Sequence, residues 1–207
     1  NSVSLSSDGS ILAVGAWLND GNGSESGHVR VYQYSDSSWT QLGGDLDGEA
    51  AQDQLGYSVA LSSDGSILAT GARYNSGKGH VRVYQYSGSS WTQLGADIDG
   101  EATGDLFGTS VSLSSDGLTM AAGAQHNDGN GANAGHVRVY KYSSGTWTKQ
   151  GADLDGEAEG DNWGVAVQLS SDGLTLVAGA ILNDGNGSNS GHVRIYNWNG
   201  SSWNQIG

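Results

Sequence analysis

A repeated segment of somewhat more than fifty residues constrains this chain more than any other feature. The core of the repeat reads Ser-Val-x-Leu-Ser-Ser-Asp-Gly or a close variant, and its valine falls at Val3, Val59, Val111 and Val167. Successive copies are therefore 56, 52 and 56 residues apart. A fixed period of this length indicates stacked structural units rather than one or two ordinary domains, and the 207 residues hold four units.

Each unit is expected to form four antiparallel strands. Alternating apolar residues such as Val111 and Leu113 predict the first strand, and the Ser-Ser-Asp-Gly that follows predicts a hairpin turn. A second strand runs through Ile-Leu-Ala-Val-Gly-Ala or a variant of it. The third strand starts at His28, His80, His136 and His192, and the fourth centres on Trp39, Trp91, Trp147 and Trp203.

The sheet predicted for each unit carries bulky apolar side chains on both faces. In the third strand, Val29 and Val31 point to one side, whereas Tyr32 and Tyr34 point to the other. Such a sheet must be covered on both faces, and radial repetition of the unit achieves this. We therefore predict an all-β fold, a β-propeller built from four tandem four-stranded antiparallel blades. The blades form either a four-bladed ring or four blades of a larger propeller or array.

The whole chain, residues 1–207, is interpreted as a single repeat domain. Its blades are expected at approximately residues 1–44, 57–96, 109–152 and 165–207, joined by acidic linkers at 45–56, 97–108 and 153–164. The sequence thus holds three of the four linkers of a symmetric ring. Closure of a four-bladed ring is expected to rest on side-chain packing alone, or on another chain.

The charge balance restricts the partners of the protein. Eight Lys and Arg residues stand against 22 Asp and Glu residues, so the net charge is −14. This charge repels nucleic acids and anionic lipid surfaces, and no apolar segment is long enough to span a bilayer. Cations and neutral ligands are favoured, and neither nucleic-acid binding nor direct membrane insertion is expected.

The linkers contain the best candidate metal ligands. Each reads Asp-x-Asp-Gly-Glu followed by one more Asp, and alternating carboxylates in a loop with glycine suit Ca²⁺. The candidate ligands are Asp45, Asp47, Glu49, Asp53, Asp97, Asp99, Glu101, Asp105, Asp153, Asp155, Glu157 and Asp161. The alternative is that one carboxylate of each linker pairs with the arginine of the third strand and that others bond loop N–H groups.

The loop between the second and third strands is a second candidate site, for a cation or a sugar. It reads Asn-Asp-Gly-Asn-Gly in three units, at residues 19–27, 127–135 and 183–191, but is shortened to residues 75–79 in the second unit. Clusters of Asn, Asp and Gly also form ordinary turns. Trp17 and His126 break the symmetry of the repeat beside this loop and are candidate ligand contacts.

Two short motifs resemble those of FG-GAP-type propeller repeats, which occur in integrin α-subunit heads and in many secreted or cell-surface proteins. The first is Phe107-Gly108 before the first strand, with Leu55-Gly56 and Trp163-Gly164 in the sister linkers. The second is the Gly-Ala that ends each second strand, as in Val14-Gly15-Ala16. The resemblance implies a β-propeller at the cell surface or outside the cell. The integrin-type calcium loop has no counterpart here, because only Ser-Ser-Asp-Gly joins the first two strands.

These observations favour a non-enzymatic extracellular or cell-surface module that binds a protein or glycan ligand in adhesion. No Ser-His-Asp set, carboxylate pair or phosphate loop stands apart from the repeats. The alternative is a structural building block that assembles with copies of itself or with other chains into a ring, tube or filament.

Overall fold

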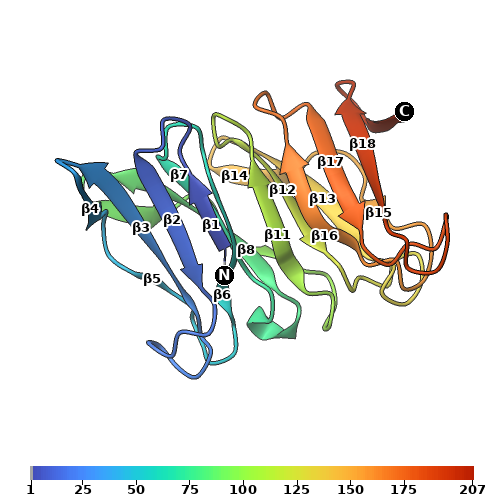
Figure 1. The fold of residues 1–207 in the computed structure, drawn as a ribbon, viewed down its shortest axis with the longest axis horizontal. Helices are drawn as coiled ribbons and strands as arrows, with labels where there is room; N and C mark the ends of the chain where they lie inside the picture. The colour runs from blue at the N-terminus through green and yellow to red at the C-terminus, as the bar shows by residue number, and fades with distance from the viewer. Residues whose placement is uncertain (1) are drawn as a thin grey trace.

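The computed structural model describes residues 2–207 and contains four antiparallel sheets, one for each repeat. The sheets lie side by side in chain order, with the first and last at opposite ends of the molecule (Figure 1). Each has four main strands that follow one another through hairpins. The all-β fold with four four-stranded blades, predicted from the alternation of apolar residues, is confirmed.

The strand bounds are as follows. The first sheet contains β1 (Ser2–Leu5), β2 (Ile11–Ala16), β3 (His28–Ser35), β4 (Ser38–Gln41) and β5 (Leu46–Asp47). The second contains β6 (Leu55–Leu61), β7 (Ile67–Ala72), β8 (His80–Ser87), β9 (Ser90–Gln93) and β10 (Ile98–Asp99), with the 3₁₀ turn η1 (Asn75–Gly77). The third contains β11 (Phe107–Leu113), β12 (Thr119–Ala124), β13 (His136–Ser143), β14 (Thr146–Lys149) and β15 (Leu154–Asp155). The fourth contains β16 (Trp163–Leu169), β17 (Thr175–Ala180), β18 (His192–Trp198) and β19 (Trp203–Ile206).

The linkers between sheets are more regular than the sequence indicates. The short strands β5, β10 and β15 lie inside them and pair with the third strand of their own sheet. The first strand of the later sheets begins at Leu55, Phe107 and Trp163, so the Phe-Gly motif lies inside this strand and not before it. The register shifts just after the motif, between Phe107 and Ser110 in the third sheet. The period-two alternation of apolar residues in the sequence does not reveal a bulge of this kind.

The core lies between the sheets. Val81 and Val83 on one face of β8 are 0% and 1% exposed, and they cluster with Phe107, Val111 and Leu113 of the next sheet. The other two junctions repeat this packing. Because every internal sheet is covered on both faces, the sheets stack as propeller blades do.

The four blades form an open arc. The first strands of successive blades pack on one another, β1 on β6, β6 on β11 and β11 on β16. Among the described residues no such packing joins β16 to β1. Of the two arrangements predicted, four blades of a larger propeller or array therefore fits, and a closed four-bladed ring does not.

A pair of glycines fixes the distance between blades. Gly108, of the Phe-Gly motif, has φ +87° and lies against Gly71, the next-to-last residue of the second strand of the preceding blade. A Cβ atom added to Gly108 would lie 3.1 Å from the Gly71 Cα atom. A Cβ atom added to Gly71 would overlap the Gly108 carbonyl group. The two motifs therefore meet across each junction, with no room for a side chain.

We predict that Gly123→Ala strongly destabilises the protein, because the new Cβ would overlap the Gly164 carbonyl oxygen of the next blade. The expected loss is at least about 2 kcal/mol of unfolding free energy, measured by urea denaturation. The matched control is Gly179→Ala, the same position in the last blade, where the nearest atom is 3.8 Å from the added Cβ. Equal effects of the two substitutions would contradict the proposed role of the glycine pair.

Candidate functional site

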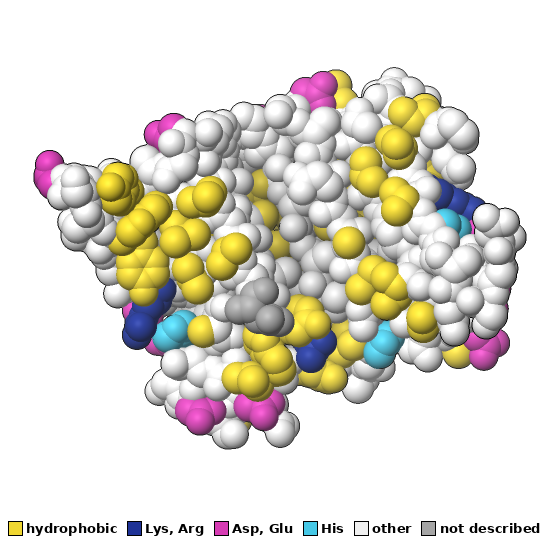
Figure 2. All heavy atoms as spheres, in the orientation of Figure 1, with side chains coloured by type: hydrophobic (Ala, Val, Ile, Leu, Met, Phe, Trp, Pro, Cys, Tyr) yellow, Lys and Arg dark blue, Asp and Glu magenta, His cyan; other side chains and the backbone are white. Residues whose placement is uncertain are grey.

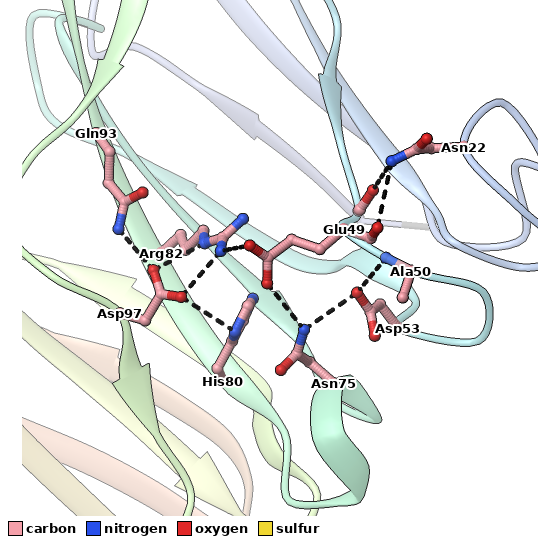
Figure 3. Close-up of polar contacts among 10 residues, drawn as sticks. Asn22, Glu49, Ala50, Asp53, Asn75, His80, Arg82, Gln93 and Asp97 are labelled. Atoms are coloured by element: carbon pink, nitrogen blue, oxygen red, sulfur yellow. Dashed lines mark hydrogen bonds and ion pairs between the residues drawn. The ribbon is translucent and has the colours of Figure 1, made fainter.

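An arginine at each blade junction is held by carboxylates from two different linkers. Arg82 of β8 donates from Nε to Asp97 Oδ1 at 2.8 Å and from Nη2 to Asp97 Oδ2 at 2.9 Å. Its Nη2 also pairs with Glu49, which belongs to the preceding linker (Figure 3). Arg138 repeats the arrangement with Asp153 and Glu101. Each guanidinium group thus connects the third strand of its blade to both linkers that flank the blade.

The end blades hold half of this arrangement. Arg30 bonds Asp45 of its own linker, at 2.9 and 2.8 Å, and its side chain is 42% exposed. Arg194 pairs with Glu157 of the preceding linker. The side chains of Arg82 and Arg138, held from both sides, are only 11% and 7% exposed.

The ion pairs shift the protonation equilibria of both partners. Hydrogen bonds from Arg30 and Gln41 lower the pKa of Asp45 to about 2. The hydrogen bond to Arg82 is also the main cause that lowers the pKa of Glu49 and of Asp97. In return, the bond to Asp97 raises the pKa of Arg82. These carboxylates are therefore ionised at neutral pH and committed to the arginines.

A histidine lies two residues before each of these arginines, at the start of the third strand. The imidazoles of His80 and His136 are buried, with 2% and 1% of the residue exposed. His80 Nδ1 lies 3.9 Å from Asp97 Oδ2, and the ring of His136 packs edge-on against Phe107. Burial lowers the pKa of both histidines. They are neutral packing groups at pH 7.

The last acidic residue of each linker is buried and bonds the next blade. Asp53 Oδ2 accepts from the Ala50 backbone N–H at 2.8 Å and from Asn75 Nδ2 at 3.1 Å (Figure 3). Asp105 and Asp161 make the same two bonds in their linkers, to Asn127 and Asn183. These aspartates fix the linker to the loop between the second and third strands of the following blade.

The four carboxylates of each linker therefore have different partners. Asp45, Asp97 and Asp153 bond the arginine of their own blade. Glu49, Glu101 and Glu157 reach the next arginine. Asp53, Asp105 and Asp161 are buried against asparagines. Asp47, Asp99 and Asp155 lie exposed on the short linker strands.

The structure brings candidate ligands together in three groups. Glu49 lies within 4.8 Å of His80 and Asp97, and Glu101 lies likewise with His136 and Asp153. In these two groups, which combine carboxylates of different linkers, the arginine already binds both carboxylates. The third group, His28 with Asp45 and Asp47, combines two carboxylates of one linker, and Arg30 binds Asp45. The alternative prediction, arginine pairing, thus describes the contacts that the structure contains.

The Asn-Asp-Gly loops use their polar side chains on their own backbone. Asp20 Oδ1 accepts from the Glu25 N–H at 2.8 Å, and Asn19 Oδ1 accepts from the Gly21 N–H at 2.8 Å. Asn22 donates across to the Gly48 carbonyl of the linker at 2.8 Å. The loops of the third and fourth blades repeat the turn bonds. These residues are turn formers here, and they dock the loop on the linker.

A hollow of about 750 Å³ opens beside the shortened loop of the second blade. Its lining includes Glu25, Glu49, Asp53, Gln52 and Tyr74. The residue Tyr74 is 43% exposed. The shortened loop is visible in the sequence, but the hollow is not, because the hollow depends on how two blades are placed.

An aromatic cluster around Arg73 adjoins the hollow through Tyr74. The guanidinium carbon of Arg73 lies 3.7 Å from the centre of the Tyr57 ring, 5.0 Å from that of Tyr74 and 5.5 Å from that of Trp17. Arg73 Nε also donates to Gln54 at 2.9 Å. Trp17, a predicted ligand contact, thus packs in a cation–π cluster, which holds Tyr74 in place. His126, the other predicted contact, lies 3.3 Å from the Gln125 side chain.

We predict that Arg138→Ala lowers the unfolding free energy by about 2 kcal/mol, because it leaves Glu101 and Asp153 close together without their cation. The control is Arg30→Ala in the first blade, where a single, more exposed pair is lost and the effect is smaller. Urea denaturation at pH 7 measures both. A loss from Arg30→Ala equal to that from Arg138→Ala would show that the second carboxylate adds nothing.

The buried histidines predict an acid-sensitive step in stability. Because burial lowers the pKa of His80 and His136 in the folded state, the unfolded chain takes up protons first as the pH falls through 6.5. Melting temperature should therefore be constant from pH 8 to about 7 and fall below it. A second fall is expected below about pH 4.5, where unfolded Glu49 and Asp97 protonate before the folded ones.

The double variant His80→Gln, His136→Gln separates the two steps. Glutamine has no titratable group, so the first fall should shrink by at least about half, whereas the second stays. A first fall of unchanged size would assign it to other groups.

Part of this chain is similar to a known family of repeats. The sequence profile of the FG-GAP repeat matches residues 96–140 and 153–196. No curated protein sequence matches the chain. Each matched segment starts at a linker with its Phe-Gly or Trp-Gly motif and ends within the third strand of the sheet that follows.

Solved structures show the same architecture at low sequence identity. A 6-phosphogluconolactonase candidate from Bacteroides uniformis superposes with a TM-score of 0.66 at 12% identity, over 100% of this chain and 53% of that one. A hypothetical selenium-binding protein from Sulfolobus tokodaii gives 0.59 at 13%, over 95% and 51%. The β-propeller domain of the Trilobed protease from Pyrococcus furiosus, which has an open velcro topology, gives 0.55 at 12%, over 98% and 56%. The chain spans about half the length of these proteins.

The fold therefore defines the chain as an arc of β-propeller blades. Its third and fourth blades match the FG-GAP repeat, and the two motifs that carry the resemblance meet at each blade junction. Within residues 2–207 no helix is long and apolar enough to cross a membrane.

Proposed function

We propose that this chain is a non-enzymatic binding module of an extracellular or cell-surface protein and that it holds a protein or glycan ligand at the loop side of the arc. The observation that carries the proposal is the acidic hollow between the first two blades. Its volume of about 750 Å³ falls in the range of ligand sites. The rest of the junction surface repeats from blade to blade, whereas this hollow depends on a loop found only in the second blade.

The lining of the hollow selects a polar ligand that is neutral or positively charged. Glu25 contributes a carboxylate to the lining, beside Glu49, which pairs with Arg82, and the buried Asp53. The protein as a whole has a net charge of −14. Acidic side chains project from the loops at the lower edge of the molecule (Figure 2). Such a surface attracts amino or guanidinium groups and repels phosphates. The half-exposed ring of Tyr74 offers a flat apolar face for a sugar ring or an alkyl stem.

Cation–π stacking supports the view that the hollow is preformed. Arg73 is fixed between Tyr57, Tyr74 and Trp17, so Tyr74 does not need to be ordered when a ligand binds. A rigid aromatic side chain loses little entropy on binding. The FG-GAP repeat, typical of extracellular proteins, supports a role in adhesion.

Screening of a glycan array and of a set of Lys- and Arg-rich peptides tests the proposal. Both are probed with calcium and with chelator, because calcium bound by the linkers is part of the same hypothesis. The variant Tyr74→Ala should weaken the best hit by about tenfold. Leu182→Ala is the matched control, since Leu182 occupies the same position in the last blade with similar exposure, 37%. Absence of any hit, or equal binding by both variants, would overturn the proposal.

A further inference from the structure

Neighbouring blades meet at three junctions within the molecule, and each junction buries one face of each blade. On the last blade the corresponding face is exposed. Val193 and Ile195 of β18 are 66% and 39% exposed. The corresponding pair in β8, Val81 and Val83, is 0% and 1% exposed, because the next blade covers it. A hollow of about 480 Å³ next to Gly179 and Val193 marks the uncovered side. We call this surface the last-blade face.

The first blade exposes the other half of the junction. Val3 and Leu5 are 68% and 56% exposed, whereas the corresponding Val59 and Leu61 are 7% and 9% exposed. Trp39, which corresponds to the buried Trp91, is 44% exposed. Figure 2 shows hydrophobic side chains gathered over β1 to β3. We call this surface the first-blade face. Apolar side chains at this density on a sheet face favour a protein partner.

Backbone hydrogen bonds between the hairpin turns give the junction a direction. Ser7 N–H donates to the Ser63 carbonyl at 2.9 Å, Ser63 to Ser115 at 2.9 Å and Ser115 to Ser171 at 2.8 Å. Each blade donates to the blade that follows. Ser171 is the last donor of the series within the described residues, and the Ser7 carbonyl is the matching acceptor at the other end.

The tryptophans add hydrogen bonds that run in the opposite direction, from each blade to the blade that precedes it. Trp91 Nε1 donates to the Leu42 carbonyl at 2.8 Å, Trp147 to Leu94 at 2.7 Å and Trp203 to Gln150 at 2.9 Å. Trp39 is the corresponding donor on the first-blade face, and Ile206 carries the corresponding carbonyl on the last blade. The two faces thus match in apolar surface, in turn bonds and in indole bonds.

We propose that the last-blade face of one copy of this chain docks on the first-blade face of a second copy. The contact is head to tail, so two copies can close on each other through two equivalent junctions. Two copies of the four-bladed arc together hold eight blades, a number that a propeller ring accommodates. A closed ring of two copies is therefore the expected assembly.

The charge of the protein predicts how salt affects the assembly. Each copy carries a net charge of −14, which opposes association at long range, whereas the docking faces are apolar. Screening of the repulsion by salt should strengthen association. This dependence is opposite to that of a contact built on ion pairs.

Sedimentation velocity and light scattering of the chain, from about 5 to 200 µM, test the proposal. The mass should be twice that of the 21.3 kDa chain at high concentration, and the dissociation constant should fall as NaCl rises from about 50 to 500 mM. The proposal would be overturned if the chain stayed monomeric at all concentrations. This outcome includes the case in which another protein or further repeats cover the two faces.

Two single-face variants test the head-to-tail geometry. Val3→Glu spoils the first-blade face and Val193→Glu the last-blade face, and both positions are exposed enough to leave the fold intact, which a circular dichroism melt checks. Each variant alone should be monomeric, but their mixture should form a 1:1 dimer through the one junction that remains. Ser89→Glu, in an exposed turn of the second blade, should behave as the wild type. A dimeric Val3→Glu variant, or a mixture that stays monomeric, would overturn the docking geometry.

Discussion

The contact between two glycines from neighbouring blades is the constraint on which the rest of this structure depends. Where Gly71 meets Gly108, two sheets approach until backbone touches backbone. Only at that distance can the indole of Trp147 reach the Leu94 carbonyl and the Ser63 turn reach the Ser115 turn. A side chain at either glycine would separate the blades and weaken all of these contacts together. The two short motifs of the repeat are therefore the two halves of one joint.

The strands and the architecture could be predicted from sequence because their signals are local. A period of two residues identifies a strand, a Ser-Ser-Asp-Gly identifies its turn, and a period near fifty residues identifies a stack. The Phe-Gly motif was misplaced for an equally local reason. Glycine with positive φ is typical of a turn, but Gly108 uses it within a bulge of β11. The pattern of the sequence does not distinguish these two uses.

The candidate site was harder to predict because it is assembled across blades. The sequence places Asp97 and Glu101 in one linker, and their spacing suggests a common ligand. In the structure β10 pairs with β8 and the chain then turns, so Asp97 faces Arg82 and Glu101 faces Arg138 of the next blade. Alternating carboxylates therefore serve two cations instead of sharing one. The pairing of Asp97 with Arg82 was foreseen as an alternative, but the second carboxylate on each arginine was not.

The junction and the proposed binding site place opposite demands on the repeat. A junction works best when every copy is the same, since each blade must fit both neighbours. A ligand site needs a feature that the other blades lack. Shortening the loop at residues 75–79 satisfies both demands, because it opens a hollow without disturbing the glycine joint or the Asp53 bond to Asn75. Specific binding is therefore most readily placed at the second unit, which departs from the common pattern.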